Sequence, residues 1–266
     1  MHLQLSEAIA ERLEILERCG STNTELVERA SASPEAWPDF SVLVTGEQTA
    51  GRGRLGRTWV APPGQTIAIS VLLRSGVALD ADGLGWIPLI SGLAMARAVD
   101  AAITGHEVGL KWPNDVQIDG LKVAGLLAEL VGASEGGGGT AVVMGAGVNL
   151  TIGVADLPTA TSTSLMLNNP VVAIGELADV VLSGYLRELR ALYPLLVERG
   201  ADAVAAQVAE RCTTLGRDVV VHLPDGTEVL GTAIDLDETG RLRVKRGDDG
   251  RLLVVAAGDV THLRYE

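Results

Sequence analysis

The sequence predicts an α+β fold in which a larger domain of mixed strands and helices, residues 1–212, is followed by a small β-barrel, residues 213–266. The first observation is that two helical stretches, residues 84–103 and 175–211, alternate with strand-like segments. The second is that the sequence pattern changes after Gly216, where short strand-like segments alternate with turn signals at residues 224–226, 238–240 and 248–250. Such regular spacing is typical of a small barrel.

Strand patterns dominate the first 150 residues. Residues 6–18 fit either one amphipathic helix or a short helix followed by a strand at 13–15, and both alternatives stay open. Thr22 and Glu25 fit a capping box, which predicts a helix over residues 23–30. Asp119-Gly120 is a hairpin turn signal, and residues 136–139 predict a glycine loop. The expected strands cover residues 41–45, 66–73, 107–112, 116–118, 123–130 and 140–148.

Composition restricts the class of protein. The net charge of −13 argues against general affinity for a nucleic-acid backbone, so no DNA partner is expected. The two cysteines form no disulfide or metal-binding pattern, and the first residues lack a signal-peptide core, which favours a cytoplasmic protein. The apolar stretch 84–103 contains Pro88, Arg97 and Asp100, so it predicts a buried helix rather than a membrane span.

A loop rich in glycine and arginine covers residues 50–57. It contains a G-x-G-x-x-G pattern, but no helix follows it, so a dinucleotide-binding interpretation fails. The guanidinium groups of Arg52, Arg54 and Arg57 would repel one another unless an anion neutralised them, and arginine forks suit phosphate oxygens. A solvated surface loop explains the same residues equally well, and the pattern alone does not decide.

Residues 111–115, Lys-Trp-Pro-Asn-Asp, place a cation, an amide and a carboxylate at the end of a strand. Proline cannot serve a central ladder, so the chain must leave the sheet here. Trp112 is expected to be a packing residue. The alternative for the whole motif is a charged turn anchored by that tryptophan.

Two further short motifs follow along the chain. Lys122 enters an apolar strand, where its ammonium must either reach solvent or face an anion, and Gly125 would let a ligand approach the backbone. Gly145 and Gly147 lie in a later strand, and close packing is the favoured explanation for both.

Taken in order, these motifs resemble the biotin–protein ligases from about Gly20 to Asn149, and more loosely to the end of the chain. The resemblance implies a mixed-sheet catalytic domain related to class II aminoacyl-tRNA synthetases, followed by an SH3-like domain. It implies ATP-dependent formation of biotinyl-5′-AMP and transfer of biotin to a lysine. The matching segments are residues 21–23, 48–57, 111–116, 122–125 and 145–149.

The resemblance also implies roles for individual residues. Biotin would be bound by Ser21, Thr22, Asn23, Gln48, Gly51, Arg52, Lys122 and Gly125. ATP would be bound by Arg54, Arg57, Trp59, Lys111, Asn114, Asp115 and Asn149, with Trp59 stacking on adenine. Catalytic roles would fall to Lys122, Arg54 and Asp115. Biotin and ATP would be the substrates, Mg²⁺ the cofactor with its ligands unassigned, and a biotin carboxyl carrier protein or domain of acyl-CoA carboxylases the partner.

Three alternatives remain beside this interpretation. A lipoate or octanoate ligase or transferase on the related fold is the nearest, and the complete arginine loop together with Lys-Trp-Pro-Asn-Asp favours biotin. A biotin-sensing DNA-binding regulator is opposed by the acidic charge and by Ser21, which leaves no room before it for a winged helix. A nucleotide-binding module without catalysis explains the paired cationic motifs less well.

Overall fold

The computed structural model describes residues 1–266 except 78, 132–138, 224–225, 256–258 and 264–266. Within these residues the strands form a seven-stranded sheet, ordered β1-β2-β3-β7-β6-β5-β4, and a five-stranded sheet, ordered β11-β10-β9-β8-β12. The expected loop at 136–139 lies almost wholly outside the described residues. The larger sheet consists of β1 (Arg12–Leu16), β2 (Ser41–Thr45), β3 (Thr66–Arg74), β4 (Val108–Lys111), β5 (Asp115–Ile118), β6 (Leu121–Leu130) and β7 (Ala141–Asn149).

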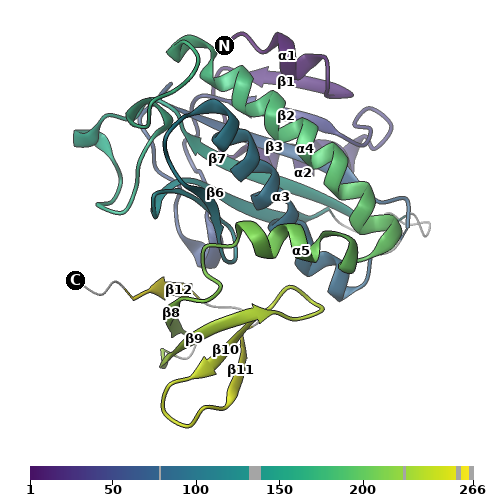
Figure 1. Cartoon of the computed structure of the whole chain (residues 1–266). Helices are drawn as coiled ribbons and strands as arrows, with labels where there is room; N and C mark the ends of the chain where they lie inside the picture. Colours follow the sequence, from purple (N-terminus) through teal and green to yellow (C-terminus); the bar gives the residue numbers. More distant parts are fainter. Residues whose placement is uncertain (78, 132–138, 224–225, 256–258, 264–266) are drawn as a thin grey trace.

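Helices cover both faces of this sheet (Figure 1). On one face lie α3 and α4, whose apolar side chains share the main core with the sheet, and α2 packs on the opposite face. The helices are α1 (Gln4–Glu7), α2 (Thr22–Ala32), α3 (Ala81–Ala102), α4 (Leu177–Arg199) and α5 (Asp202–Arg211). Short 3₁₀ turns lie at Arg54–Gly56, Val154–Asp156, Leu165–Leu167 and Ile174–Glu176.

The N-terminal segment adopts the second of its two predicted alternatives, a short helix α1 followed by strand β1. Strand β1 pairs parallel with β2, while the other neighbours in this sheet pair antiparallel, so the sheet is mixed. The helix expected at residues 23–30 is present as α2, but the capping box is wrong. Ser21 is the N-cap and makes no side-chain cap bond. The Thr22 hydroxyl donates to Gln48 Oε1 instead, because the turn faces a pocket rather than its own backbone.

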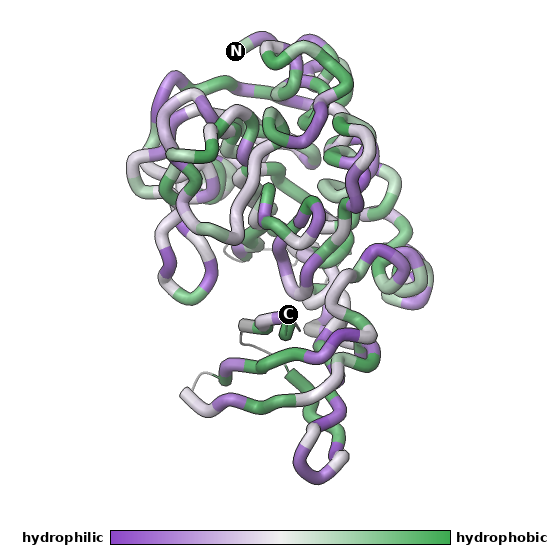
Figure 2. The backbone as a smooth tube through the Cα atoms, turned by 60° about the vertical axis from the view of Figure 1, so that its left-hand side comes forward, coloured by the Kyte–Doolittle hydropathy of each residue, from purple (hydrophilic) through white to green (hydrophobic). Residues whose placement is uncertain are grey.

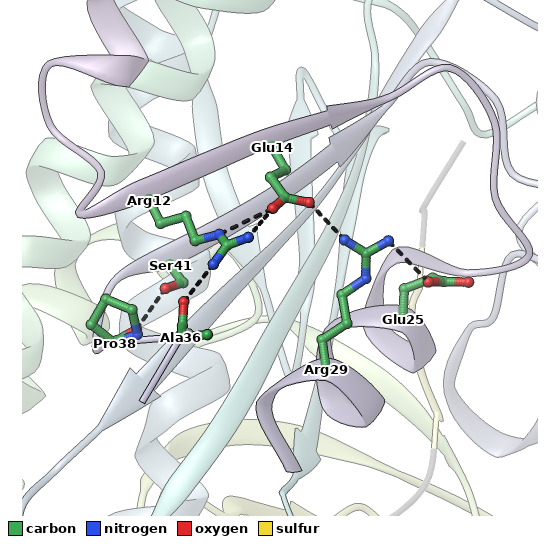
Figure 3. A network of polar contacts seen from close by, with 7 residues as sticks. All are labelled: Arg12, Glu14, Glu25, Arg29, Ala36, Pro38 and Ser41. Atoms are coloured by element: carbon green, nitrogen blue, oxygen red, sulfur yellow. Dashed lines mark hydrogen bonds and ion pairs between the residues drawn. The ribbon is translucent and has the colours of Figure 1, made fainter. Parts of the chain in front are cut away.

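A polar network holds α2 against the edge strand β1 (Figure 3). Glu14 on β1 pairs with Arg12 beside it and with Arg29 on α2, where Arg29 Nη1 lies 2.6 Å from Glu14 Oε2. The Arg12 guanidinium stacks over the Trp37 ring at 4.0 Å from its centroid. It also donates to the carbonyl of Ala36 at 2.6 Å. These half-buried contacts set the position of the helix whose first turn carries Ser-Thr-Asn.

Alternation along the central strands makes the two faces of the sheet different. On β3, Ile67, Ile69 and Val71 point into the core beneath α3 and α4, because side chains alternate along a strand. The intervening residues face the α2 side, where Ala68 and Ser70 are small and Leu72 packs under α2. The neighbouring strand β7 repeats the pattern, with glycines at 145 and 147 on the α2 side. Small residues leave that face hollow, so the sequence itself creates a pocket there.

The smaller sheet consists of β8 (Asp218–His222), β9 (Glu228–Leu236), β10 (Leu242–Arg246), β11 (Leu252–Val255) and β12 (Asp259–His262). It forms a separate lobe below the larger domain (Figure 2). Two buried tryptophans join the lobes. Trp86 Nε1 donates to the carbonyl of Glu238 at 2.8 Å, and Trp112 Nε1 donates to that of Gly240 at 3.0 Å. The packing role expected for Trp112 is confirmed. A boundary between residues 212 and 213 stays a prediction, because buried residues of both lobes share one core.

Helix α3 begins a turn earlier than expected and includes Pro88 near its start. Its segment Asp82–Ala102 is long and apolar enough, by length and composition, to cross a membrane. Yet 67% of its most apolar window is buried inside the protein, where it packs against α4 and the sheet. This burial is what the sequence predicted for a core helix.

Candidate active site

One pocket on the α2 side of the sheet brings most of the predicted site residues together. It lies where the first turn of α2, the arginine loop and strands β3, β6 and β7 meet. The predicted residues in its wall are Ser21, Thr22, Asn23, Gln48, Arg52, Arg54, Arg57, Trp59, Asn114, Asp115, Lys122 and Gly125. The wall also contains residues that no motif singled out as ligand contacts, namely Gly53, Thr58, Ala68, Ile69, Leu126, Leu127, Gly145, Ala146 and Gly147.

Gln48 is fixed in orientation at one end of the pocket. Its Oε1 accepts from the Thr22 backbone N–H at 2.9 Å and from the Thr22 hydroxyl at 3.2 Å. The amide nitrogen of Gln48 therefore turns toward Gly51, where an added Cβ would lie only 3.0 Å from it. Gly51 itself borders the adjoining hollow of the arginine loop rather than this pocket. This end thus offers neutral, hydrogen-bonding groups.

The arginine loop forms another part of the pocket wall. Gly53 N–H donates to the carbonyl of Arg57 at 2.7 Å, which closes a tight turn. The Arg54 guanidinium enters the pocket and donates from Nη1 to Asn114 Oδ1 at 3.1 Å. Burial lowers the pKa of Arg54, an effect that nearby Asp115 opposes and nearby Arg57 reinforces. Partial burial of a cation is costly without an anion, so this placement favours the anion-binding interpretation over a solvated loop.

Ion pairs hold two of the remaining cations in the pocket wall. Lys122 Nζ lies 2.7 Å from Asp115 Oδ1, and both side chains are half-buried. Arg52 pairs with Glu129 across the mouth. Lys122 therefore faces an anion rather than reaching for solvent. Its ammonium carries three donors, so it can keep Asp115 and contact a bound anion together.

Trp59 covers the glycines at the floor of the pocket. Gly125 and Gly147 are register partners on β6 and β7. A Cβ on Gly147 would lie 2.6 Å from Trp59 Cε2, and one on Gly125 would lie 3.2 Å from Cζ3. Gly147 has no room for a side chain and also lines the pocket, so close packing as its role stays a prediction. Trp59 Nε1 is buried, and the described residues supply it with no hydrogen-bond partner. Stacking of Trp59 on adenine stays a prediction.

Two predicted nucleotide contacts lie outside the pocket wall. Asn149 is buried, and its Nδ2 donates to the carbonyl of Thr163 at 2.9 Å. Lys111 ends β4, beyond the lining residues. Their nucleotide roles stay predictions. The sequence motifs also did not predict that Leu126 and Leu127 line the pocket. Their position on β6, directly after the matched residues 122–125, could have indicated it.

The described residues contain no group of three or more His, Cys, Asp or Glu side chains arranged to hold a metal ion. Among the lining residues, Asn114 and Asp115 carry the side-chain oxygens that contact Arg54 and Lys122. Hard cations such as Mg²⁺ are commonly held by one or two carboxylates together with substrate phosphates. This sparse donor set fits an ion that arrives largely with phosphates.

Comparison with known proteins identifies the family of the chain. The biotin/lipoate A/B protein ligase family model matches residues 15–149, and the biotin protein ligase C-terminal domain model matches residues 214–263. The biotin–[acetyl-CoA-carboxylase] ligase of Mycobacterium tuberculosis is 40% identical over 95% of this chain and 90% of its own length. The corresponding ligase of Paracoccus denitrificans is 34% identical over 91% of this chain and 98% of its own.

A solved structure confirms the predicted fold class. The biotin protein ligase from Aquifex aeolicus, in complex with biotin and ATP, superposes with a TM-score of 0.70. It covers 96% of this chain and 100% of that one, at 24% identity, which supports the fold alone. The matched motifs, the two family models and the M. tuberculosis relative together show that the chain belongs to the biotin–protein ligases of the biotin/lipoate A/B protein ligase family.

Proposed function

We propose that this protein activates biotin with ATP to biotinyl-5′-AMP and transfers the biotin to a lysine of a biotin carboxyl carrier protein or domain of acyl-CoA carboxylases. One observation carries the proposal beyond family membership. The pocket wall combines neutral hydrogen-bonding groups at Thr22 and Gln48 with the cations of Arg54 and Lys122. Such a pocket suits a substrate with a neutral ring system and an anionic end.

In the first step, a carboxylate oxygen of biotin attacks the α-phosphorus of ATP. A carbon–oxygen–phosphorus link forms, the bond to the β-phosphate breaks, and diphosphate leaves with the electron pair. No general base is required, because the carboxylate is already ionised. Positioning and charge stabilisation dominate reactions of this type. We assign the main stabilising role to Lys122, whose ammonium can contact the α-phosphate while retaining Asp115.

In the second step, the amine of the carrier lysine attacks the acyl carbon and releases AMP. The amine must lose a proton in forming the amide. We assign its acceptance to Asp115, the carboxylate that lies in the pocket wall between the loop and β6. Arg54 folds over the same space and would retain the reactive adenylate until the lysine arrives. Excluding water protects such an anhydride from hydrolysis.

Mg²⁺ belongs to the proposal as a shield for the phosphates. Asn114 and Asp115 are the residues that would hold it, directly or through water, because their oxygens lie beside Arg54 and Lys122. When bound, the ion would neutralise charge on the departing diphosphate. The carrier partner, a cytoplasmic location and the lack of DNA or membrane partners are likewise proposals. The net charge of −13 supports the lack of DNA binding.

The test follows AMP and diphosphate formation from ATP by the purified protein. Release is expected only when biotin and Mg²⁺ are both present, and a carrier domain should be labelled on a single lysine. Lipoate and octanoate are compared in the same assay. Equal or better use of either would replace the proposal with the related lipoate chemistry.

A further inference from the structure

The side chain of Asn23 lies across three strands of the sheet. Ser70 on β3, Gly145 on β7 and Leu127 on β6 are direct neighbours in the strand register. Ser70 Oγ donates to Asn23 Oδ1 at 2.6 Å. Asn23 Nδ2 donates to the carbonyl of Leu127 at 3.1 Å. The amide of a helical residue thus joins the two strands on either side of β7.

Gly145 lies directly beneath this amide. A Cβ built on Gly145 would approach Asn23 Oδ1 to 2.2 Å, and Cγ and Nδ2 to 2.7 Å. Real Cβ atoms essentially never come so close. The φ of Gly145 is not in the left-handed region, so the backbone would accept a side chain. Glycine is therefore required here by Asn23 and not by the backbone conformation.

The burial of Asn23 and Ser70 allows only one orientation of the Asn23 amide. Asn23 is 4% exposed and Ser70 is fully buried. The Leu127 carbonyl can only accept, so it determines which end of the amide faces it, and Ser70 must then donate to the other end. Losing either bond would leave a buried polar atom without a partner, which is costly. The contact therefore holds Asn23 in one place and one orientation.

We propose that Asn23 is a positioning residue rather than a ligand contact. Ser70 holds its amide by a hydrogen bond, and Gly145 leaves the space that the amide fills. Asn23 follows directly after Ser21 and Thr22, which line the neutral end of the pocket. Anchoring Asn23 to β3 and β6 fixes the first turn of α2, and through it the Thr22–Gln48 bonds. The anchor thereby acts on the Thr22 and Gln48 side of the pocket, where biotin would bind. This inference rests on the proposed function.

Ser70→Ala tests the anchor with a small change, and Ser41→Ala is its matched control. Ser41 is equally buried in the same sheet, and its Oγ donates to the carbonyl of Pro38 at 2.7 Å (Figure 3). It does not line the pocket.

For Ser70→Ala we expect the KM for biotin to rise about tenfold, equivalent to about 1.4 kcal/mol. The KM for ATP and kcat at saturating biotin should stay within about twofold. For Ser41→Ala we expect all three parameters to match the wild type. Thermal unfolding of both variants shows whether each loses similar stability, so that a general loss is separated from a biotin-specific one.

A double-mutant cycle tests the role assigned to Gly145. Gly145→Ala should raise the KM for biotin more than Ser70→Ala, because the clash involves the amide itself. In the Asn23→Ala background the amide is gone, so Gly145→Ala should add about twofold or less. An equal effect of Gly145→Ala in both backgrounds would show that the glycine serves the ligand directly and would overturn the inference.

The failure of the inference and that of the proposed function give different results. If the wild type binds no biotin by calorimetry, the proposed function is wrong. If the wild type binds biotin and Ser70→Ala binds it equally well, only the positioning role is wrong. A parallel rise in the KM values for biotin and ATP would also overturn it, since that result marks a general loss of structure. Should Asn23→Ala fail to fold, the Ser70 and Ser41 pair still decides.

Discussion

Replacement of Arg54 by glycine should make the enzyme leak its reactive intermediate. Arg54 is a loop cation in the pocket wall, where it donates to Asn114 Oδ1 at 3.1 Å across 60 residues of sequence. Burial of this guanidinium lowers its pKa, and nearby Asp115 opposes that effect. A bound phosphate would supply further negative charge. Arg54 should therefore contribute more to holding the adenylate than to forming it.

The magnitude follows from what the substitution removes. One hydrogen bond to a charged group is worth about 1.5–3 kcal/mol. Glycine also adds backbone freedom that loop closure must then remove. Together these should speed adenylate release roughly ten- to a hundredfold. Adenylation should continue, because Lys122 and the other arginines remain in place.

The assay mixes the variant with biotin, ATP and an unrelated lysine-rich protein, which is then blotted for biotin. Escaping adenylate should label this bystander. Two controls separate the causes: Arg54→Ala removes the guanidinium with little added freedom, and Leu55→Gly adds freedom while leaving every arginine. Leu55 suits this role because it is 61% exposed and has φ of 55°, a conformation that glycine adopts easily. An unlabelled bystander beside normal adenylate synthesis by Arg54→Gly would refute the reasoning. Strong labelling by Leu55→Gly would assign retention to loop stiffness instead.

Three other outcomes are expected. Lys122→Ala should slow single-turnover adenylate formation on the order of a hundredfold or more, by analogy with loss of one oxyanion donor; an unchanged rate would show that Lys122 serves only its ion pair with Asp115. Trp112→Phe should lower the free energy of unfolding in urea by about 1–3 kcal/mol, because the buried carbonyl of Gly240 loses its donor; an unchanged midpoint would mean that the bond joining the two lobes adds nothing. DNA binding should be absent at a net charge of −13, and a band shift that responds to biotinyl-adenylate and resists competitor DNA would contradict this.

Local pattern was sufficient wherever one side chain or one turn determines the outcome. Strand β2 has the bounds that its apolar run predicts, 41–45. Asp119 and Gly120 both adopt positive φ, as a two-residue hairpin requires, so the Asp-Gly dipeptide alone predicted that turn. The helix break at Gly200, with φ of 75°, was similarly visible. Short motifs likewise identified most of the pocket wall, since the residues that bind charged groups are chemically conspicuous.

Contacts between segments far apart in the sequence could not be predicted, because no local pattern shows which distant residue a side chain will meet. Thr22 could have capped its own helix, but Gln48 lies beside it in the fold and takes its hydroxyl. Gly145 and Gly147 looked alike in the sequence, yet one lies beneath Asn23 and the other beneath Trp59.

By itself, then, the sequence determined the class of fold, the chemistry of the pocket and the family to which the chain belongs. Only the tertiary structure decided which polar side chains pair with one another. It pairs Lys122 with Asp115, Arg54 with Asn114 and Asn23 with Ser70. The physical reason is that a buried polar group must find its partner wherever the packed chain provides one. That partner is set by the register of strands and the docking of a helix, which only the folded chain establishes.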